Sequence, residues 1–244
     1  MSRITLLHFQ GSPNCAVAHL ALRRKNLTAR AVELPIGLHP AILRALGFRR
    51  GIVPAARIDG RRVQGSTQIM RALDELVPEP RLFPNPEVAE LERWGEEVVQ
   101  TIPRRIANRL VRRTPRHSRT FPPAGLVGRV PAPVATALTE PTLRFQAWRL
   151  KTGDEAELHA ALRELGPTLD RIAELVREGR LDAGSPTAAD LQIAPQIRML
   201  TLFDDLRPAI ERRPEVHAWA LAVVPDYPGH VPAVLRPEER ERVA

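Results

Sequence analysis

The sequence has a single cysteine and lacks the patterns of a membrane or secreted protein. One cysteine excludes an internal disulfide and a multi-cysteine metal site, so we expect a reducing, cytoplasmic location. The seven histidines form no close cluster along the chain, and we therefore expect no metal site. No apolar run approaches the roughly 18 residues of a membrane span, and the N-terminus lacks a signal-peptide pattern. We expect no membrane partner.

The chain is also poor in lysine and in aromatic residues. Lysine occurs only at Lys25 and Lys151, so nearly all of the 36 basic residues are arginine, and the net charge is +8. Aromatic residues make up 4%, which disfavours a stacking surface for single-stranded nucleic acid. The densest basic group could attract nucleic acid, but a solvated helix face followed by a basic loop explains it better. This group comprises Arg104, Arg105, Arg109, Arg112, Arg113, Arg116 and Arg119.

The first third of the chain alternates between strand and helix patterns. We predict strands at residues 3–9 and 29–34 around a helix at 14–26, which makes a parallel β-α-β unit. A short helix at 39–46 follows, then a hairpin over 53–64 whose Asp59-Gly60 turn is a strong hairpin signal. Ser66 is predicted to cap a helix at 67–76. The expected order is β-α-β-α-β-β-α.

A proline-rich linker separates this part from an all-helical remainder. We expect a first domain at 1–77, the linker at 78–86 and a helical domain at 87–244. A kink is expected at Pro103, a long loop at 114–132, and an extended tail from Pro225 that could return over the body. Thr187 and Asp190 have the spacing of a capping box that opens an apolar helix. The predicted helices are 87–113, 133–152, 154–179, 187–203, 205–212 and 214–223.

The turn between the first strand and the first helix contains Ser12-Pro13-Asn14-Cys15. A polar side chain here lies under the positive end of the helix, where backbone N–H groups stabilise an anion. In a thioredoxin-like fold, Ser12 takes the leading position of a C-x-x-C pair and Cys15 the trailing one. The hydroxyl cannot form a disulfide with Cys15, but it can donate a hydrogen bond to the sulfur of a ligand. The alternative is that Ser12 is a plain helix cap.

Several motifs in order resemble the cytosolic glutathione transferases, in particular serine-type members with a theta-like N-terminal domain. They are the Ser12 turn, Val53-Pro54, Gln64-Gly65-Ser66, Leu82-Phe83-Pro84 and Thr187-Ala188-Ala189-Asp190. The resemblance implies a thioredoxin-like, glutathione-binding domain followed by an all-helical domain, usually in a homodimer, with a role in detoxification.

The resemblance also assigns roles to individual residues. Ser12 resembles the serine that hydrogen-bonds the glutathione sulfur and favours its thiolate. Val53 resembles the residue whose backbone pairs with the cysteinyl part of glutathione, and Pro54 would follow a cis bond. Gln64 and Ser66 resemble the pair that holds the γ-glutamyl end. Many relatives have Glu or Gln where this chain has Gly65, so one ligand contact is missing.

Cys15 is the second candidate catalytic residue, and three interpretations stay open. It could be an inert, buried side chain, a redox thiol that forms a mixed disulfide with glutathione, or a relic of a dithiol turn. Burial is favoured, because a free cysteine is commonly buried. The leading and exposed position of such a turn is Ser12, which argues against Cys15 as the primary nucleophile.

The resemblance implies an enzyme that conjugates glutathione, or a related small thiol, to small hydrophobic electrophiles. The alternatives are a non-catalytic binding or dimerising module of the same fold, and a thiol-disulfide oxidoreductase that acts through Cys15. Trp94, Arg104, Arg105 and the 114–132 loop are candidate lining for the electrophile pocket, whereas Trp148 is expected in the core.

Overall fold

The computed structural model describes residues 2–35, 37–113 and 154–243. The loop predicted at 114–132, the helix predicted at 133–152 and the core position predicted for Trp148 lie outside the described residues.

The N-terminal part is built on a four-stranded mixed sheet with the order β2-β1-β3-β4. Strand β1 (Ile4–His8) is parallel to β2 (Arg30–Glu33) and antiparallel to β3 (Ala55–Ile58), which pairs in turn with β4 (Arg61–Gln64). At the hairpin turn Asp59 and Gly60 have φ of 47° and 87°. Two successive positive φ values define the tight turn that an Asp-Gly pair favours, so the predicted hairpin is confirmed.

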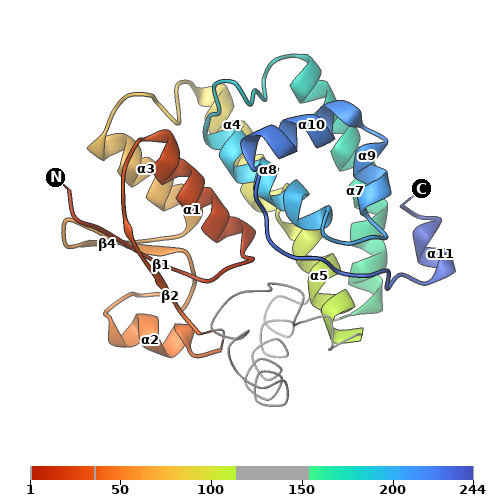
Figure 1. Ribbon diagram of the computed structural model, residues 1–244, viewed down its shortest axis with the longest axis horizontal. Coiled ribbons are helices and arrows are strands. Elements are labelled where there is room, and N and C mark those ends of the chain that lie inside the picture. The colour runs from red at the N-terminus through yellow and green to blue at the C-terminus, as the bar shows by residue number, and fades with distance from the viewer. Residues whose placement is uncertain (1, 36, 114–153, 244) are drawn as a thin grey trace.

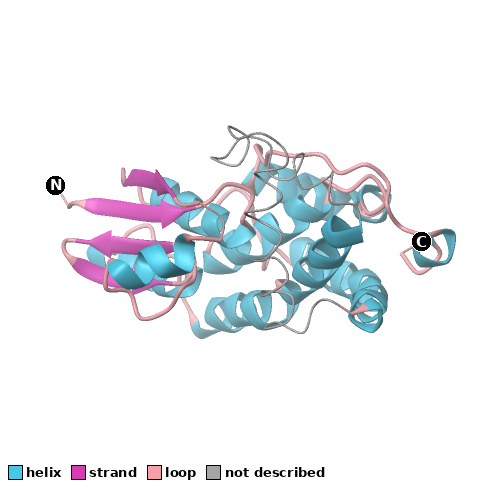
Figure 2. Cartoon of the chain, turned by 90° about the horizontal axis from the view of Figure 1, so that it is seen from below, coloured by secondary structure: helices cyan, strands magenta, loops and turns pink. Residues whose placement is uncertain are grey.

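Helices cover both faces of this sheet, as Figures 1 and 2 show. Helices α1 (Pro13–Arg24) and α3 (Ser66–Leu76) lie on one face and α2 (His39–Ala45) on the other. The alternation of β1 explains both layers: Leu6 belongs to the main core with α1 and α3, whereas Leu7 packs with Leu43 of α2. The predicted thioredoxin-like order of elements is confirmed.

The C-terminal part is helical and packs against α1 through its central helix. Its elements are α4 (Pro86–Trp94), a π-helical turn (Gly95–Val99), α5 (Thr101–Arg113), α7 (Glu155–Arg177), α8 (Ala188–Leu200), α9 (Arg207–Glu211), α10 (Pro214–Val223) and α11 (Pro237–Arg240). Helix α8 contacts α1, α4 and α10, and nearly all of its residues are buried. One continuous apolar core therefore extends from the sheet through α1 into the helical domain.

The interruption of the helix predicted over 87–113 lies earlier than expected. Pro103 is the third residue of α5, and the irregular turn is the π-helical segment Gly95–Val99 before it. Proline lacks the N–H that would bond the carbonyl of Val99, and it is tolerated in a first turn. Gly95 also approaches α8 closely, because a Cβ there would lie 2.8 Å from Ile193 Cγ1.

The segment between α3 and α4 is held to both domains. Asp74 accepts hydrogen bonds from the N–H groups of Leu82 and Phe83 at 2.9 and 3.1 Å. The Lys25 ammonium forms an ion pair with Asp74 and donates to the carbonyl of Pro80 at 2.6 Å. The Ala188 N–H at the start of α8 donates to the Leu82 carbonyl at 2.8 Å. These bonds fix the relative placement of the two domains.

The capping box predicted at Thr187 and Asp190 opens α8, and the Asp190 carboxylate also makes bonds that the prediction did not include. The Asp190 carboxylate accepts from the Thr187 N–H at 2.8 Å, which is the predicted return bond. The Thr187 hydroxyl also donates to the same carboxylate at 2.8 Å. Two further donors, the Trp219 indole N–H at 3.0 Å and the Asp182 N–H at 2.7 Å, complete four hydrogen bonds. Asp190 therefore ties α8 to α10 as well as capping its own helix.

The tail beyond α10 returns over the helical domain. Val231 is buried, and its N–H and C=O bond the Leu202 carbonyl and the Asp204 N–H at 2.8 and 3.0 Å. The tail ends in α11, where Glu239 is buried against Arg113 of α5.

Candidate functional site

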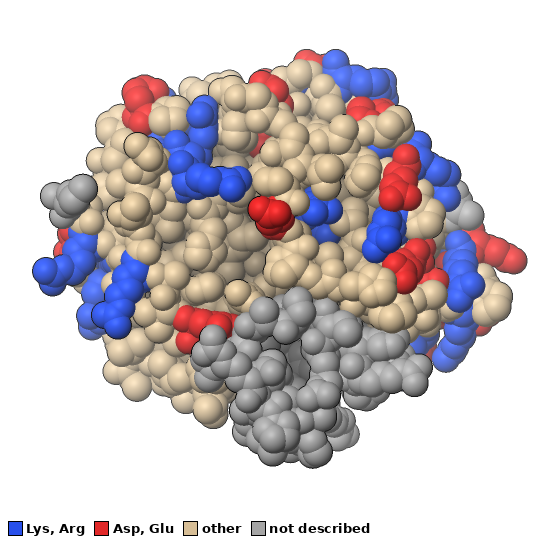
Figure 3. Space-filling model, viewed as in Figure 1, with Lys and Arg blue, Asp and Glu red and all other residues tan. Residues whose placement is uncertain are grey.

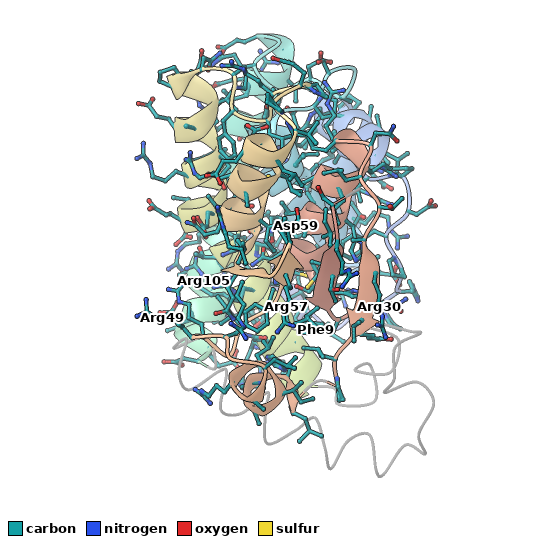
Figure 4. The ribbon with its side chains drawn as sticks, turned by 90° about the vertical axis from the view of Figure 1, so that its left-hand side faces the viewer. Phe9, Arg30, Arg49, Arg57, Asp59 and Arg105 are labelled. Atoms are coloured by element: carbon teal, nitrogen blue, oxygen red, sulfur yellow. The ribbon has the colours of Figure 1, made fainter. Side chains whose placement is uncertain are left out.

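The sheet register brings most of the predicted site residues to one end of the sheet. Leu7 pairs with Ala55, and Ala55 pairs with Gln64, so β1 ends where β3 begins and β4 ends. The turn after β1, the segment before β3 and the entry to α3 therefore lie together. Figure 4 labels Phe9, which follows β1 at this end, and Asp59, which lies in the hairpin turn at the opposite end.

Ser12 is the N-cap of α1, with the β-region backbone that a cap requires. Its Oγ accepts a 3.4 Å hydrogen bond from the Cys15 N–H, and the side chain is half-buried. Pro13 follows at the first helical position, where its fixed φ suits the helix. The first turn contains no acidic residue, so no side chain there offsets the positive end of the helix.

Cys15 lies beneath this turn and is 2% exposed. Burial raises the pKa of the Cys15 thiol to about 11, although the Ser12 hydroxyl and the Phe9 backbone act in the opposite direction. A thiol in this state is almost fully protonated at neutral pH, and the thiolate is the nucleophilic form.

The Ser12 turn is also held by the helical domain and the tail, which the sequence did not indicate. The Tyr227 hydroxyl donates to the Gly11 carbonyl at 2.9 Å. The Gln196 amide of α8 donates to the Asn14 side chain at 3.0 Å. Tyr227 and Gln196 lie more than 180 residues from the turn in sequence, and neither carries a local motif. The sequence predicted only that the tail from Pro225 returns over the body, without naming a contact with the Ser12 turn.

Val53 lies two residues before β3 begins at Ala55. In the part of the chain that the structure describes, neither the N–H nor the C=O of Val53 has a hydrogen-bond partner. The Val53–Pro54 bond is cis, as the resemblance implied. The Pro54 carbonyl accepts from the Gly65 N–H at 2.9 Å, which places the two segments side by side.

Gln64 turns toward the protein instead of standing free. Its Oε1 accepts from the Arg50 N–H at 2.9 Å, and its Nε2 donates to the Arg50 carbonyl at 2.5 Å. A longer bond of 3.4 Å reaches the Ile52 carbonyl. The amide therefore braces the segment that leads into Val53.

The start of α3 differs by one residue from the sequence prediction. Gly65 is the N-cap, and Ser66 is the first helical residue, 3% exposed. Gly65 has φ of +94°, a region that side chains disfavour, and an added Cβ would meet nothing within 4 Å. The backbone conformation, not crowding, accounts for glycine here. The N-terminus of α3 nevertheless lies at the site end of the sheet.

Two of the residues expected to line an electrophile pocket face other helices. Trp94 lines a hollow of about 270 Å³ together with Leu91 of α4 and Leu175 of α7. Arg105 of α5, labelled in Figure 4, forms ion pairs with Glu157 and Glu164 of α7. Arg104 neighbours it on α5.

One further cluster has ligand atoms close enough to hold a metal. Glu155, His159 and Glu239 each bring one such atom within 4.8 Å of the others. Arg113 donates to Glu239 at 2.7 and 2.6 Å and also bonds Glu155, as does Arg109. Arginine already supplies the positive charge that these carboxylates need.

Two further features of the structure concern the charge on its surface and the length and hydrophobicity of its helices. On the face drawn in Figure 3, basic side chains are scattered over both domains, and acidic ones lie between them on the helical side. Among the described residues, no helix is long and apolar enough to cross a bilayer.

The comparisons agree with this architecture. Residues 6–81 match the family model described as "Glutathione S-transferase, N-terminal domain". A glutathione S-transferase from Rhodospirillum rubrum is 24% identical, with a TM-score of 0.62, covering 91% of this chain and 87% of the other. The chain has the glutathione transferase fold. The family model over residues 6–81 and the architecture thus confirm the predicted likeness to glutathione transferases.

Other structures with the glutathione transferase fold are more distant in sequence. The beta-etherase LigF from Sphingobium sp. strain SYK-6 is 18% identical, with a TM-score of 0.66 and 98% coverage of both chains. A Tau class glutathione S-transferase from mango, Mangifera indica, is 14% identical, with a TM-score of 0.58, covering 92% of this chain and 89% of the other. The search of curated proteins found no match.

Proposed function

We propose that this chain is a glutathione transferase-like enzyme that conjugates glutathione, or a related small thiol, to small hydrophobic electrophiles. The observation that carries the proposal is the convergence of three features at one end of the sheet. Ser12 caps α1, Val53 offers backbone groups that no other described residue bonds, and Ser66 begins α3. In this proposal residues 1–77 bind the thiol, 78–86 link the domains, and 87–244 form the helical half of a cytoplasmic homodimer.

The chemistry needs a thiolate at neutral pH. A free thiol has a pKa of about 8.5, so only a few per cent is ionised at pH 7. A hydrogen bond to a charged group is worth roughly 1.5–3 kcal/mol, and a helix N-terminus adds roughly 0.3–1 kcal/mol. At about 1.36 kcal/mol per pKa unit, these effects would lower the pKa of the bound thiol by between one and three units. Ser12 and α1 together would suffice.

In the reaction, the thiol proton leaves to solvent while the Ser12 hydroxyl donates to the sulfur. The thiolate then attacks the electrophilic carbon, forming a carbon–sulfur bond. With an aryl halide, the carbon–halogen bond breaks and halide leaves with the electron pair. Proximity of the two bound reactants supplies the remaining rate advantage.

Backbone and helix ends would orient the thiol. The N–H and C=O of Val53, which bond no other described residue, can pair with an extended peptide as a further strand would. In this proposal Gln64 supports the site without contacting the ligand, because its amide bonds the backbone of residues 50–52 before Val53. The N-terminus of α3 at Ser66 suits a carboxylate of the ligand. Cys15 serves as a packing residue, which its burial supports.

A second candidate is a non-catalytic module of the same fold. Gly65 favours it, because this position supplies no side chain to the ligand. Under this alternative, glutathione would bind weakly or not at all, and no conjugation would be measured with any electrophile.

Three substitutions at Ser12 separate catalysis from helix capping. Ser12→Thr keeps both the cap acceptor and the hydroxyl donor, Ser12→Asp keeps only the cap, and Ser12→Ala loses both. Glutathione binding is measured by calorimetry, and conjugation with aryl halides, epoxides and isothiocyanates. Ser185→Ala, which alters a serine that bonds Arg24, serves as the control.

We expect Ser12→Thr to stay active and Ser12→Asp to lose tenfold to about a hundredfold in kcat/KM while remaining as stable as the wild type. Equal activity in the wild type, Ser12→Asp and Ser12→Ala would remove Ser12 from the mechanism. Binding without turnover in the wild type would favour the non-catalytic module.

A further inference from the structure

The outward side of α2 is apolar, although a surface helix usually turns polar residues outward. Helix α2 turns His39 and Leu43 toward the protein, where both are buried. The helical spacing places Leu38, Ala41 and Ala45 on the opposite side. All three are exposed, and Leu38 is the most exposed large apolar side chain among the described residues, at 55%. This stripe offers an apolar contact to a partner outside the described chain.

A row of arginines crosses the sheet on the side where α2 packs. The strand register aligns Arg30 of β2 with Thr5 of β1, and Thr5 with Arg57 of β3. Arg57 is aligned in turn with Arg62 of β4. Side chains aligned in this way point to one face, and it is the face on which Leu7, two residues after Thr5, packs with α2. Because Arg30, Arg57 and Arg62 are exposed, this arginine row lies beside α2 and not beneath it.

The positive charge of the row is not neutralised within the described chain. Arg57 and Arg62 stand directly opposite each other, and like charges in such positions destabilise a sheet. Neither Arg30 nor Arg57 has a carboxylate partner among the described residues, and the same is true of Arg44 on α2. Arg62 donates to the Leu46 carbonyl at the C-terminal end of α2 at 2.9 Å, so side chains of the row can reach the level of that helix. An anion from outside would relieve the repulsion.

The net charge of the whole chain is concentrated in the first domain. Residues 1–77 contain 12 basic and 4 acidic residues, whereas residues 78–244 contain 24 of each. From Leu34 to Ile58, a range that includes α2 and β3, there is no acidic residue. Figure 4 labels Arg30, Arg49 and Arg57, which come from β2, the segment after α2 and β3. This side of the domain therefore attracts anionic surfaces from a distance.

Exposed apolar side chains beside unpaired arginines fit the surface of a bilayer that contains anionic phospholipids. Such a surface attracts basic side chains to its headgroups and takes up apolar side chains at the boundary with the acyl chains. Nucleic acid would engage the arginines but would leave the apolar stripe in water. Neither α2 nor the arginine row contains an aromatic Phe, Tyr or Trp on which a base could stack. Contact of this kind lies on the surface and requires no spanning helix.

We propose that α2 and the arginine row bind the surface of a membrane rich in anionic phospholipids. In this arrangement Leu38 enters the headgroup boundary, and Arg30, Arg44 and Arg57 contact lipid phosphates. The surface does not include Ser12 and does not depend on thiol binding. This proposal and the proposed transferase activity can therefore fail independently.

The test is sedimentation of the untagged full-length chain with phosphatidylcholine vesicles, prepared with and without phosphatidylglycerol. One variant combines three substitutions on the proposed surface: Arg30→Gln, Arg44→Gln and Arg57→Gln. Its matched control removes the same charge from exposed arginines of the helical domain, by Arg163→Gln, Arg171→Gln and Arg242→Gln. Thermal unfolding of each variant shows that it is folded.

A second pair of variants tests the apolar stripe. Leu38→Gln removes its most exposed side chain, and Leu221→Gln on α10, where the leucine is 42% exposed, is the matched control. A gel shift with duplex DNA, run on the same proteins, tests the alternative partner.

We expect binding only to the vesicles with phosphatidylglycerol, and weaker binding as salt is raised. Each basic side chain near an anionic surface strengthens binding about fivefold, so the surface variant should lose about a hundredfold in affinity. Leu38→Gln should lose about tenfold, and both controls should stay close to the wild type.

Three results would overturn the proposal. The first is the absence of binding to anionic vesicles, and a DNA shift lost in the surface variant would then assign the row to nucleic acid. The second is an equal loss in the two triple variants, which would make the attraction a matter of net charge. The third is full binding by Leu38→Gln, because the apolar stripe would then not touch the bilayer.

Discussion

Removing the Tyr227 hydroxyl should make the Ser12 turn open more often while lowering the stability of the whole protein only slightly. Tyr227→Phe deletes one oxygen and keeps the ring, so the change is confined to the 2.9 Å bond to the Gly11 carbonyl. A hydrogen bond of this kind contributes roughly 0.5–1.5 kcal/mol net. For a chain of this size, about 1 kcal/mol corresponds to a fall of roughly 2–4 °C in Tm.

The local effect is measured by amide hydrogen exchange in the turn. The Cys15 N–H, which bonds Ser12 Oγ, is the reporter, and the Asp182 N–H, which bonds Asp190, is an internal control. In Tyr227→Phe we expect faster exchange at Cys15 and unchanged exchange at Asp182. Tyr227→Leu also removes the ring and should lower Tm further.

Thiol binding provides the functional readout of the same change. At a temperature well below Tm, a loss of about 1 kcal/mol leaves nearly all molecules folded, so any loss of glutathione affinity must come from the turn. A small displacement of a positioned group can cost up to about a hundredfold in rate. Unchanged exchange at Cys15 in Tyr227→Phe would refute the view that the tail holds the Ser12 turn.

Three further outcomes follow from buried polar groups. Asp190→Ala removes the acceptor of four hydrogen bonds and should cost on the order of 3 kcal/mol in urea unfolding; a loss below about 1 kcal/mol would contradict the account. The hydrogen bonds from Arg113 lower the pKa of Glu239 from 4.5 to about 2, so its stabilisation is present above pH 4.5 and is lost as the pH falls toward 2. The stability difference between wild type and Glu239→Gln, followed by chemical denaturation, should shrink over that range, and a constant difference would argue against the ion pair. The thiol of Cys15, with a pKa of about 11, should react with a disulfide reagent only after unfolding, and rapid adduct formation with oxidised glutathione in the native state would restore it as a redox candidate.

Most of the architecture could be predicted from local sequence signals. Each such signal fixes the backbone geometry within a few residues of itself, so it can be read without knowing the tertiary packing. The Asp59-Gly60 turn, the serine cap before α1 and the Thr187–Asp190 spacing each fix a nearby backbone geometry. The sequence predicts Ser66 as the N-cap of α3, because serine is a commoner N-cap than glycine. The N-cap in the structure is Gly65, one residue earlier. The positive φ that makes Gly65 the cap is a property of the turn after β4.

The contacts of the candidate site residues could be predicted less well than the elements on which they lie. The motif containing Gln64 implied a ligand contact, whereas the fold occupies that amide with residues 50–52. The bond from Tyr227 to Gly11 and the hydrogen bond between His8 and His19 join elements that meet only through tertiary packing. Sequence patterns of period 2 or 3.6 carry no information on such pairs.

A crystal structure of the full chain with glutathione tests the central claim most directly. We predict the sulfur within hydrogen-bond distance of Ser12 Oγ, the cysteinyl backbone paired with the N–H and C=O of Val53, and a carboxylate at the start of α3. Glutathione bound elsewhere, or with its sulfur out of reach of Ser12, would contradict the account.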